Sequence, residues 1–479
     1  MRIQHCRSGN RGHLLAGALV AAGLLQGAWA EDFNQPPTAE ELAKLGLEGT
    51  EWTPSGAIRA GNAEGTIPPW KNEPLAVPAG FEPGSFHPDP FPEDQPLFTI
   101  TAQNYREHAD KLTPGQEKMF ETYPDYFMNI YPTRRTAVFQ PHCYEAALEN
   151  AKRSRVVPSD RFPGLLGFEN ARLCWAFPVA KNGPQALSNL YTRPQVPWRD
   201  GFDNIAPITA SGDYEIVTLS VQVHRPYSDP ANGWNNPDFD VAVPGSAAMY
   251  YQTTTAPAKQ AGQVVLARDP ISFSKQFRQA WSYSPGQRRV KRAPQIVHDN
   301  PATSSDGLMT TDQGWGFNGP NDRFHWTLEG REEVYVPYNA YRLHSGDLKA
   351  SDVVTPQGRL NQNLARYELH RVWKLKGTLK EGTTHDYGVR VLYLDEDSWW
   401  AMLGDHYDRR GELWRLYELH TLMYYDQKAM DLTTENQYDM QAGRMVIRSL
   451  DNQEKGVDFS FRAEPSYFTP AEVRRRGLR

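Results

Sequence analysis

Alternation of apolar and polar residues along the second half of the chain predicts a large antiparallel β-structure. From about residue 212 apolar side chains recur at every second position, the period of a half-buried strand. The strands expected from this period are 214–225, 247–254, 263–267, 277–283, 367–375, 387–394, 398–407 and 412–425. Short polar turns join the last three, which predicts a meander. Within 399–403 both alternating positions are apolar, so this part of the sheet should be covered on both faces.

Short helices and a long extended segment are predicted before these strands. A helix over 38–45 is expected because Thr38 and Glu41 form a capping box, and Thr113 and Gln116 form a second box. The helices expected between residues 96 and 192 are 103–112, one beginning at 114, 144–155 and 184–191. Pro and Gly separate them, so we expect cover for the sheet, not an independent bundle. Residues 31–95 are rich in Pro and Gly and indicate an extended arm.

The first thirty residues have the pattern of an export signal. Arg2, Arg7 and Arg11 precede an apolar run over 14–25, which ends in the small-x-small site Ala28-Trp29-Ala30. The run is shorter than the roughly 20 apolar residues that span a bilayer. We therefore expect cleavage after Ala30 and, in a bacterium, a periplasmic address for the mature chain.

Charge and composition narrow the class of partner. The formal charge is −6, and it becomes −9 when the three arginines of residues 1–30 are removed. An acidic chain argues against binding nucleic acid and against electrostatic docking on anionic lipid. The charge therefore favours a neutral, apolar or protein partner. Aromatic residues make up 12% of the chain, which is compatible with a large, open β-structure. Arg474, Arg475 and Arg476 near the end are expected to form a solvated tail.

Two cysteines remain after the predicted cleavage, Cys143 and Cys174. In an oxidising compartment they are candidates for a disulfide, and two buried thiols are the alternative. No CxxC motif is present to indicate a redox or zinc site.

Several segments resemble an exported bacterial family known as a domain of unknown function, DUF1329. The matching segments are 59–68, 96–104, 131–135, 292–294 and 407–415. The family is related in fold to the periplasmic lipoprotein carrier LolA and the outer-membrane lipoprotein receptor LolB. The resemblance implies an α+β fold: an unclosed, strongly curved antiparallel β-barrel, covered or plugged by short helices, with a hydrophobic cavity. It also implies genomic neighbours of two kinds, an inner-membrane exporter and an outer-membrane barrel protein, and it supplies no catalytic residues.

The spread of these matches favours one half-barrel domain over 96–479, after the signal peptide 1–30 and the arm 31–95. Helices are expected mainly in 96–192 and strands mainly in 212–462. Five aromatic residues of the predicted sheet are candidates to line a ligand cavity, with simple core packing as the alternative. They are Trp373, Trp399, Trp400, Trp414 and Tyr425.

An internal echo offers a candidate polar site. Tyr367-Glu368-Leu369-His370 is repeated as Tyr417-Glu418-Leu419-His420, and the i, i+2 spacing places each Glu and His on one face of its strand. If the two strands are neighbours, Glu368, His370, Glu418 and His420 meet, which is enough for a metal or an acid/base site. Ordinary hydrogen bonding on the sheet is the simpler interpretation. The acidic turn Asp395-Glu396-Asp397 is expected to be a solvated hairpin tip.

These observations favour a periplasmic, non-catalytic carrier or chaperone that moves an apolar, lipid-like ligand between the inner and outer membranes. No cofactor and no metal are expected. One alternative is a hydrolase or metal-dependent enzyme that uses the Glu–His pairs. Another is a scaffold whose arm docks an envelope complex.

Overall fold

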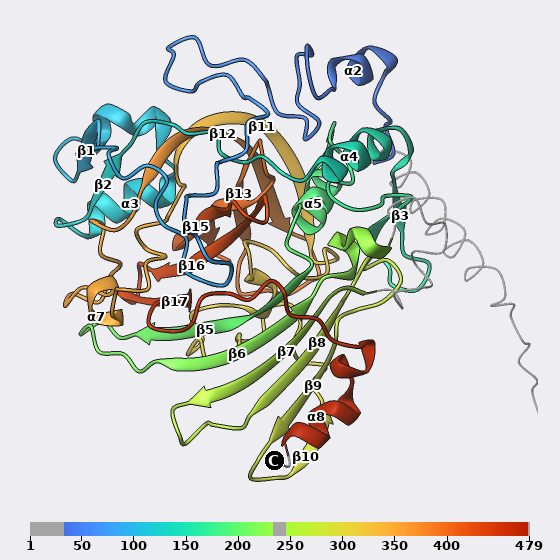
Figure 1. Ribbon diagram of the computed structural model, residues 1–479, viewed down its shortest axis with the longest axis vertical. Coiled ribbons are helices and arrows are strands. Elements are labelled where there is room, and N and C mark those ends of the chain that lie inside the picture. Colours follow the sequence, from blue (N-terminus) through green and yellow to red (C-terminus); the bar gives the residue numbers. More distant parts are fainter. Residues whose placement is uncertain (1–32, 233–245, 478–479) are drawn as a thin grey trace, which may run out of the picture.

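The computed structural model describes residues 33–232 and 246–477, and the predicted signal peptide lies outside these ranges. A single sheet of fifteen strands dominates the fold (Figure 1). Its order is β1-β2-β12-β13-β14-β15-β16-β17-β5-β6-β7-β8-β9-β10, and β11 pairs with β12. The pairings are antiparallel except for a single parallel bridge between β2 and β12. The sheet is strongly curved and does not close, which confirms the predicted open antiparallel fold with short helices.

The strand bounds follow the predicted segments closely in the second half of the chain. The strands of the sheet are β1 (Phe98–Thr101), β2 (Phe127–Ile130), β5 (Trp198–Ile208), β6 (Val217–His224), β7 (Ser246–Ala256), β8 (Val264–Pro270), β9 (Gln279–Ser284), β10 (Arg289–Arg292), β11 (Phe324–Pro337), β12 (Tyr367–Leu379), β13 (Val389–Asp395), β14 (Ala401–Tyr407), β15 (Leu413–Tyr424), β16 (Ala429–Asp439) and β17 (Arg444–Leu450). A separate hairpin consists of β3 (Arg155–Pro158) and β4 (Leu166–Glu169).

Four of the longer strands, β5, β11, β16 and β17, were not expected from the period-two pattern. In β11 the polar run 329–333, which includes a bulge between Leu328 and Gly330, separates the apolar positions at the two ends of the strand. In β16 the buried face consists largely of polar residues, among them Thr434 and Asn436. A search for alternating apolar residues therefore does not find β11 or β16.

The helices are short and cover the sheet, as expected. They are α2 (Ala39–Lys44), α3 (Pro114–Thr122), α4 (Pro141–Arg153), α5 (Gly183–Thr192), α7 (Ala350–Val353) and α8 (Pro470–Gly477), with 3-10 turns η1 (Tyr105–Lys111), η2 (Pro226–Ser228), η3 (Pro230–Asn232), η4 (Thr311–Gln313) and η5 (Pro465–Phe468). Both predicted capping boxes are present, at the N-termini of α2 and α3. None of these helices is long and apolar enough to be a candidate membrane span.

The largest hydrophobic cluster lies where α4, α5 and residues 171–180 pack against β11 to β15. Cys143 on α4 and Cys174 form a disulfide in this cluster, which is the paired alternative left open by the sequence. The C-terminal arginines are not on a free tail, because Val473 of α8 is buried against Tyr283 of β9. The prediction of a free tail was therefore wrong, although Arg474 and Arg475 are exposed to solvent as expected.

Candidate functional site

A groove lies on the outer half of the sheet, between strands β5 to β9 and the loop that joins β10 to β11. Its volume is about 390 Å³. One face of the strands forms the floor, and residues 293–318 form the roof. Apolar lining residues include Ile205, Leu219, Val265 and Ala267 on the floor and Ile296, Ala302 and Trp315 on the roof. The floor also includes Gln252, Gln263 and Ser282. Trp315 stacks on Tyr250 of β7 with ring centroids 5.6 Å apart, so this part of the loop packs on the sheet.

Polar side chains at one side of the groove are fixed by one another. Asp269 forms an ion pair with Arg278, which also donates to the backbone oxygen of Asn318 at 3.0 Å. Arg448 donates to Glu435 at 3.1 Å and is about one-fifth exposed. The lining thus combines apolar and polar side chains, which is the composition of a site for an amphipathic molecule.

The five aromatic residues predicted to contact a ligand lie elsewhere. None of them lines this groove. Trp399 and Trp400 are fully buried in the main cluster, and Trp373 stacks on Trp399 with centroids 5.6 Å apart. Tyr425 packs against Phe81 of the arm, and Trp414 against the guanidinium of Arg415. Protein side chains therefore fill the space beside the sheet around these aromatic residues. Contact between the five aromatic residues and a ligand stays a prediction.

The acidic turn after β13 is buried, so the prediction of a solvated hairpin tip was wrong. Asp395, Glu396 and Asp397 are all less than 4% exposed. Arginines replace water around them: Arg135 donates to both oxygens of Asp397 at 2.6 and 2.8 Å, and Arg371 donates to Glu396 at 2.8 Å. Ion pairs of this kind make the burial of three adjacent carboxyl groups tolerable.

The same arginines fasten the arm to the sheet. Arg135 donates to the backbone oxygen of Ile58 at 3.0 Å, and Arg371 donates to that of Ala60 at 2.6 Å. In return the backbone nitrogen of Ile58 donates to Glu396 at 3.2 Å. Two segments of the family resemblance, 59–68 and 131–135, therefore meet the acidic turn in one buried network. These contacts could not be predicted from the sequence, because the three segments are far apart along the chain.

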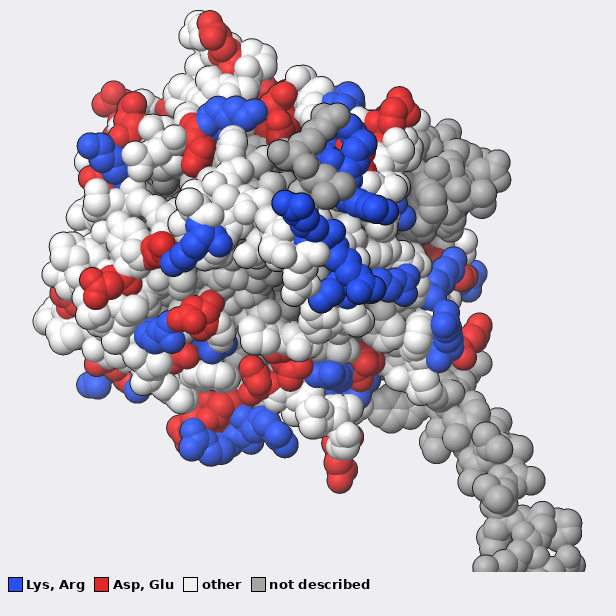
Figure 2. Space-filling view, turned by 90° about the horizontal axis from the view of Figure 1, so that it is seen from below, with Lys and Arg blue, Asp and Glu red and all other residues white. Residues whose placement is uncertain are grey.

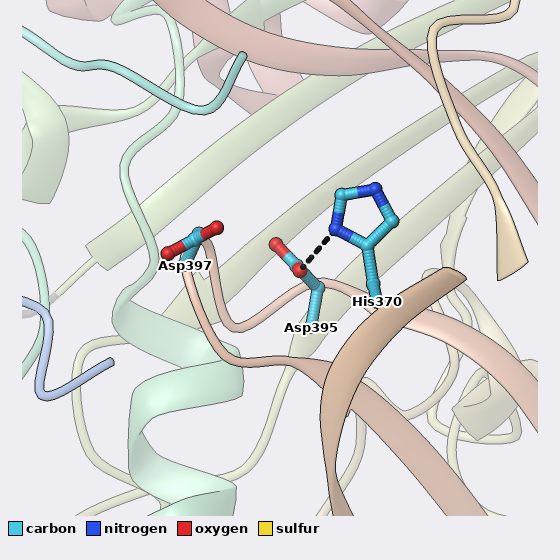
Figure 3. A group of neighbouring side chains, drawn as sticks. All are labelled: His370, Asp395 and Asp397. Atoms are coloured by element: carbon cyan, nitrogen blue, oxygen red, sulfur yellow. Dashed lines mark ion pairs between the residues drawn. The ribbon is translucent and has the colours of Figure 1, made fainter. Parts of the chain in front are cut away.

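His370, Asp395 and Asp397 form the only group of three or more His, Cys, Asp or Glu residues in the described ranges with ligand atoms close enough to hold a metal ion. Figure 3 shows Asp395 between the other two, with His370 Nδ1 and the Asp395 carboxylate 3.7 Å apart. Arg135 occupies both oxygens of Asp397, and the second nitrogen of His370 is 3.2 Å from Glu368. A positive charge of the protein thus already neutralises this cluster, which suits a structural role better than a cation site.

The two Glu–His pairs of the internal echo do not meet. They lie on β12 and β15, which β13 and β14 separate in the sheet. The hydroxyl of Tyr367 donates to Glu418 at 3.1 Å, and successive residues of a strand point to opposite faces. Glu368 therefore lies on the other face of β12 from Glu418. The condition under which the four residues would form one site is not met.

The two Glu–His pairs also differ in the charged groups that surround their carboxylates. Arg366 donates to Glu368 at 2.6 Å, and Asn339 donates to it at 2.9 Å. Among the described residues, the ion pair of Glu418 is with His420 alone, at 3.7 Å. Neither pair is among the residues that line the groove.

Comparison with known proteins places the chain in a family. The family model described as a protein of unknown function, DUF1329, matches residues 99–474. The chain belongs to the DUF1329 family. It is 41% identical over 452 residues to an uncharacterized protein of Pseudomonas aeruginosa, covering 92% of this chain and 94% of the relative. The family resemblance inferred from the sequence is thus confirmed.

Solved structures show more distant similarity. An outer membrane lipoprotein-sorting domain from Vibrio parahaemolyticus is 13% identical, with a TM-score of 0.40, and covers 61% of this chain and 98% of its own. A DUF1329 family protein from Desulfovibrio piger is 13% identical, with a TM-score of 0.37, over 58% of this chain and 90% of its own. A LolA superfamily protein from Nitrosomonas europaea is 12% identical, with a TM-score of 0.35, over 61% of this chain and 100% of its own.

Proposed function

We propose that this DUF1329 protein is a periplasmic, non-catalytic carrier or chaperone of an apolar, lipid-like ligand, and that the groove under residues 293–318 holds the ligand. The observation that carries the proposal is the groove itself. Its volume of about 390 Å³ falls within the roughly 300–1,000 Å³ of small-molecule sites. Its lining combines apolar side chains with polar ones, and the charged pair Asp269 and Arg278 is held in a fixed position.

The physical basis of such a carrier is shelter from water. Each methylene group that leaves water for an apolar surface gains about 0.8 kcal/mol. Release of the ligand then requires a membrane or a protein whose apolar surface removes the ligand from water equally well. We therefore propose an inner-membrane exporter and an outer-membrane barrel protein as the two partners. The export-signal pattern of residues 1–30 supports the periplasmic address.

The structure gives the two alternatives less support. The Glu–His pairs are buried on opposite faces of the sheet, on strands that two others separate, so the four residues do not come together as one acid/base or metal site. The arm packs on its own sheet through Arg135 and Arg371, so its contacts are internal and not those of a free docking segment.

The test is the ligand content of the protein purified from the periplasm of a bacterial host. We expect organic extraction and mass spectrometry to recover a lipid-like molecule in about one-to-one ratio with the protein. Val265 is half-buried on the groove floor, and Val265→Glu places a charge there that lowers the recovered amount severalfold. Thr255→Glu on the neighbouring strand is the matched control, because Thr255 is exposed and does not line the groove. Extracts free of ligand from the folded wild-type protein would contradict the proposal.

A further inference from the structure

A cationic face lies at the free edge of the sheet. The strand β10 ends the strand order and pairs only with β9 among the described strands. Arg289, Lys291 and Arg292 of this strand are exposed, and so is Arg288 in the turn before it. The helix α8 packs against β8, β9 and β10 and adds Arg474, Arg475 and Arg476 in its last turn. We call these seven residues the cationic face.

The concentration of positive charge is local. Residues 288–292 and 470–476 contain seven Lys and Arg and one carboxylate, Glu472, in a chain whose formal charge is −6. Glu472 pairs with Arg475 and Arg476. Among the described residues, the other five cations form no ion pair within 4.0 Å. Figure 2, seen from below, shows Lys and Arg side chains gathered over this part of the molecule.

Two ordinary explanations account for part of this pattern. Charged residues on an edge strand prevent it from pairing with another chain. Basic residues in the last turn of a helix also interact favourably with the helix dipole. Edge protection requires charge but not a single sign, and the helix-dipole effect does not require the helix to lie against a strand that carries four more cations.

An aromatic side chain lies next to the cationic face. Trp281 of β9 is half-buried, and the guanidinium groups of Arg268 and Arg292 lie 5.7 and 5.8 Å from its ring centroid. Tryptophan beside cationic side chains is the residue combination enriched at the boundary between water and a lipid bilayer.

We propose that the cationic face docks the protein on the anionic phospholipid surface of a membrane. Several exposed cations with no carboxylate partner complement a surface of phosphate headgroups, where each Lys or Arg contributes independently. Docking of this kind brings a carrier to the membrane that supplies or accepts its ligand. The net charge of the whole chain argues against such docking, but the cations that meet the lipid lie within about one Debye length of it, and the acidic residues elsewhere are screened.

The test is sedimentation of the full mature chain with vesicles of phosphatidylcholine alone or with 30% phosphatidylglycerol. We expect binding only to the anionic vesicles, and its loss when the salt concentration is raised to about 0.5 M. The variant R289E/K291E/R292E should bind at least about tenfold more weakly. The matched control is K71E/K118E/K152E, which makes the same change in net charge at exposed lysines of the arm, α3 and α4.

Two results would overturn the proposal. Equal weakening by both triple variants would show that only net charge matters. If the wild-type protein does not bind the anionic vesicles, the cationic face does not dock on a membrane, and an acidic protein segment becomes its partner instead. The vesicle assay needs no ligand in the groove, so its outcome is independent of the ligand content measured for the proposed function.

Discussion

At the scale of single residues, a buried carboxyl group without a basic partner is the clearest electrostatic feature of the sheet. Asp405 of β14 is fully buried beside the N-terminus of α3. The hydroxyl groups of Thr113 and Tyr393 donate to it at 3.1 and 3.2 Å. Burial nevertheless outweighs these hydrogen bonds and raises the pKa of Asp405 to about 7.

This pKa has a consequence for the pH dependence of stability. An Asp with a pKa of about 3.9 in the unfolded chain and about 7 in the folded one binds its proton more tightly when folded. Its contribution is fully favourable below pH 4 and is lost as the pH rises towards 7. Asp405→Asn removes the ionisation and keeps one acceptor and one donor. We expect the variant to gain about 2 kcal/mol relative to the wild type between pH 5.5 and pH 8.

Urea unfolding followed at several pH values measures this difference. Asp408→Asn is the control, because Asp408 lies in the turn after β14 and its pKa is lowered by hydrogen bonds from backbone groups and Arg410. It should show no such gain. Parallel pH profiles of the wild type and Asp405→Asn would mean that the carboxyl group ionises as in water.

At the scale of elements, Arg135 is one of the arginines that hold the arm on the sheet. Arg135 neutralises Asp397 and donates to backbone oxygens of the arm, whereas its neighbour Arg134 is 42% exposed in its side chain and pairs with Asp94. Removal of one partner from a buried ion pair costs about 3–5 kcal/mol, and loss of an exposed pair costs about 1 kcal/mol or less. Arg135→Gln should therefore destabilise the protein far more than Arg134→Gln.

The arm supplies a second measurement of the same prediction. In the wild type the guanidinium of Arg59 is held by the backbone oxygens of Thr50 and Gly46, both at 2.7 Å. Once Arg135→Gln loosens residues 58–68, trypsin should cleave after Arg59 at least severalfold faster than in Arg134→Gln. Equal rates of cleavage and equal stability of the two variants would show that other contacts hold the arm.

Elements with a local signal could be predicted from the sequence, and those set by distant contacts could not. The boxes at Thr38 and Thr113 mark their helices because a helix N-terminus is satisfied by residues three positions apart. The burial of Asp395 to Asp397 depends on Arg135, which lies more than 250 positions earlier in the chain. A polar turn looks the same in a sequence whether water or arginine surrounds it.

At the scale of the whole molecule, the sheet has two parts with different interiors. Around β11 to β15, side chains of α4, α5 and residues 171–180 fill the space, which explains why Trp399 and Trp400 have no exposed surface. Around β5 to β9, the loop 293–318 covers the strands but leaves the groove open. The antiparallel sheet was predictable from the pattern of strands, and its open form was implied by the family resemblance. Which part of it stays hollow was not, because that depends on which segments fold back over it.

This difference predicts where a ligand protects the backbone from hydrogen exchange. Bound ligand opposes any local opening that requires its release, so a free ligand concentration ten times Kd should slow such exchange about tenfold. With palmitate as the probe, we expect slower exchange of β8 and residues 293–318, and no change of residues 399–403. Val265→Glu should abolish the effect and Thr255→Glu should preserve it. Protection of residues 399–403 instead would place the ligand among the buried tryptophans and return the site to the aromatic residues first predicted.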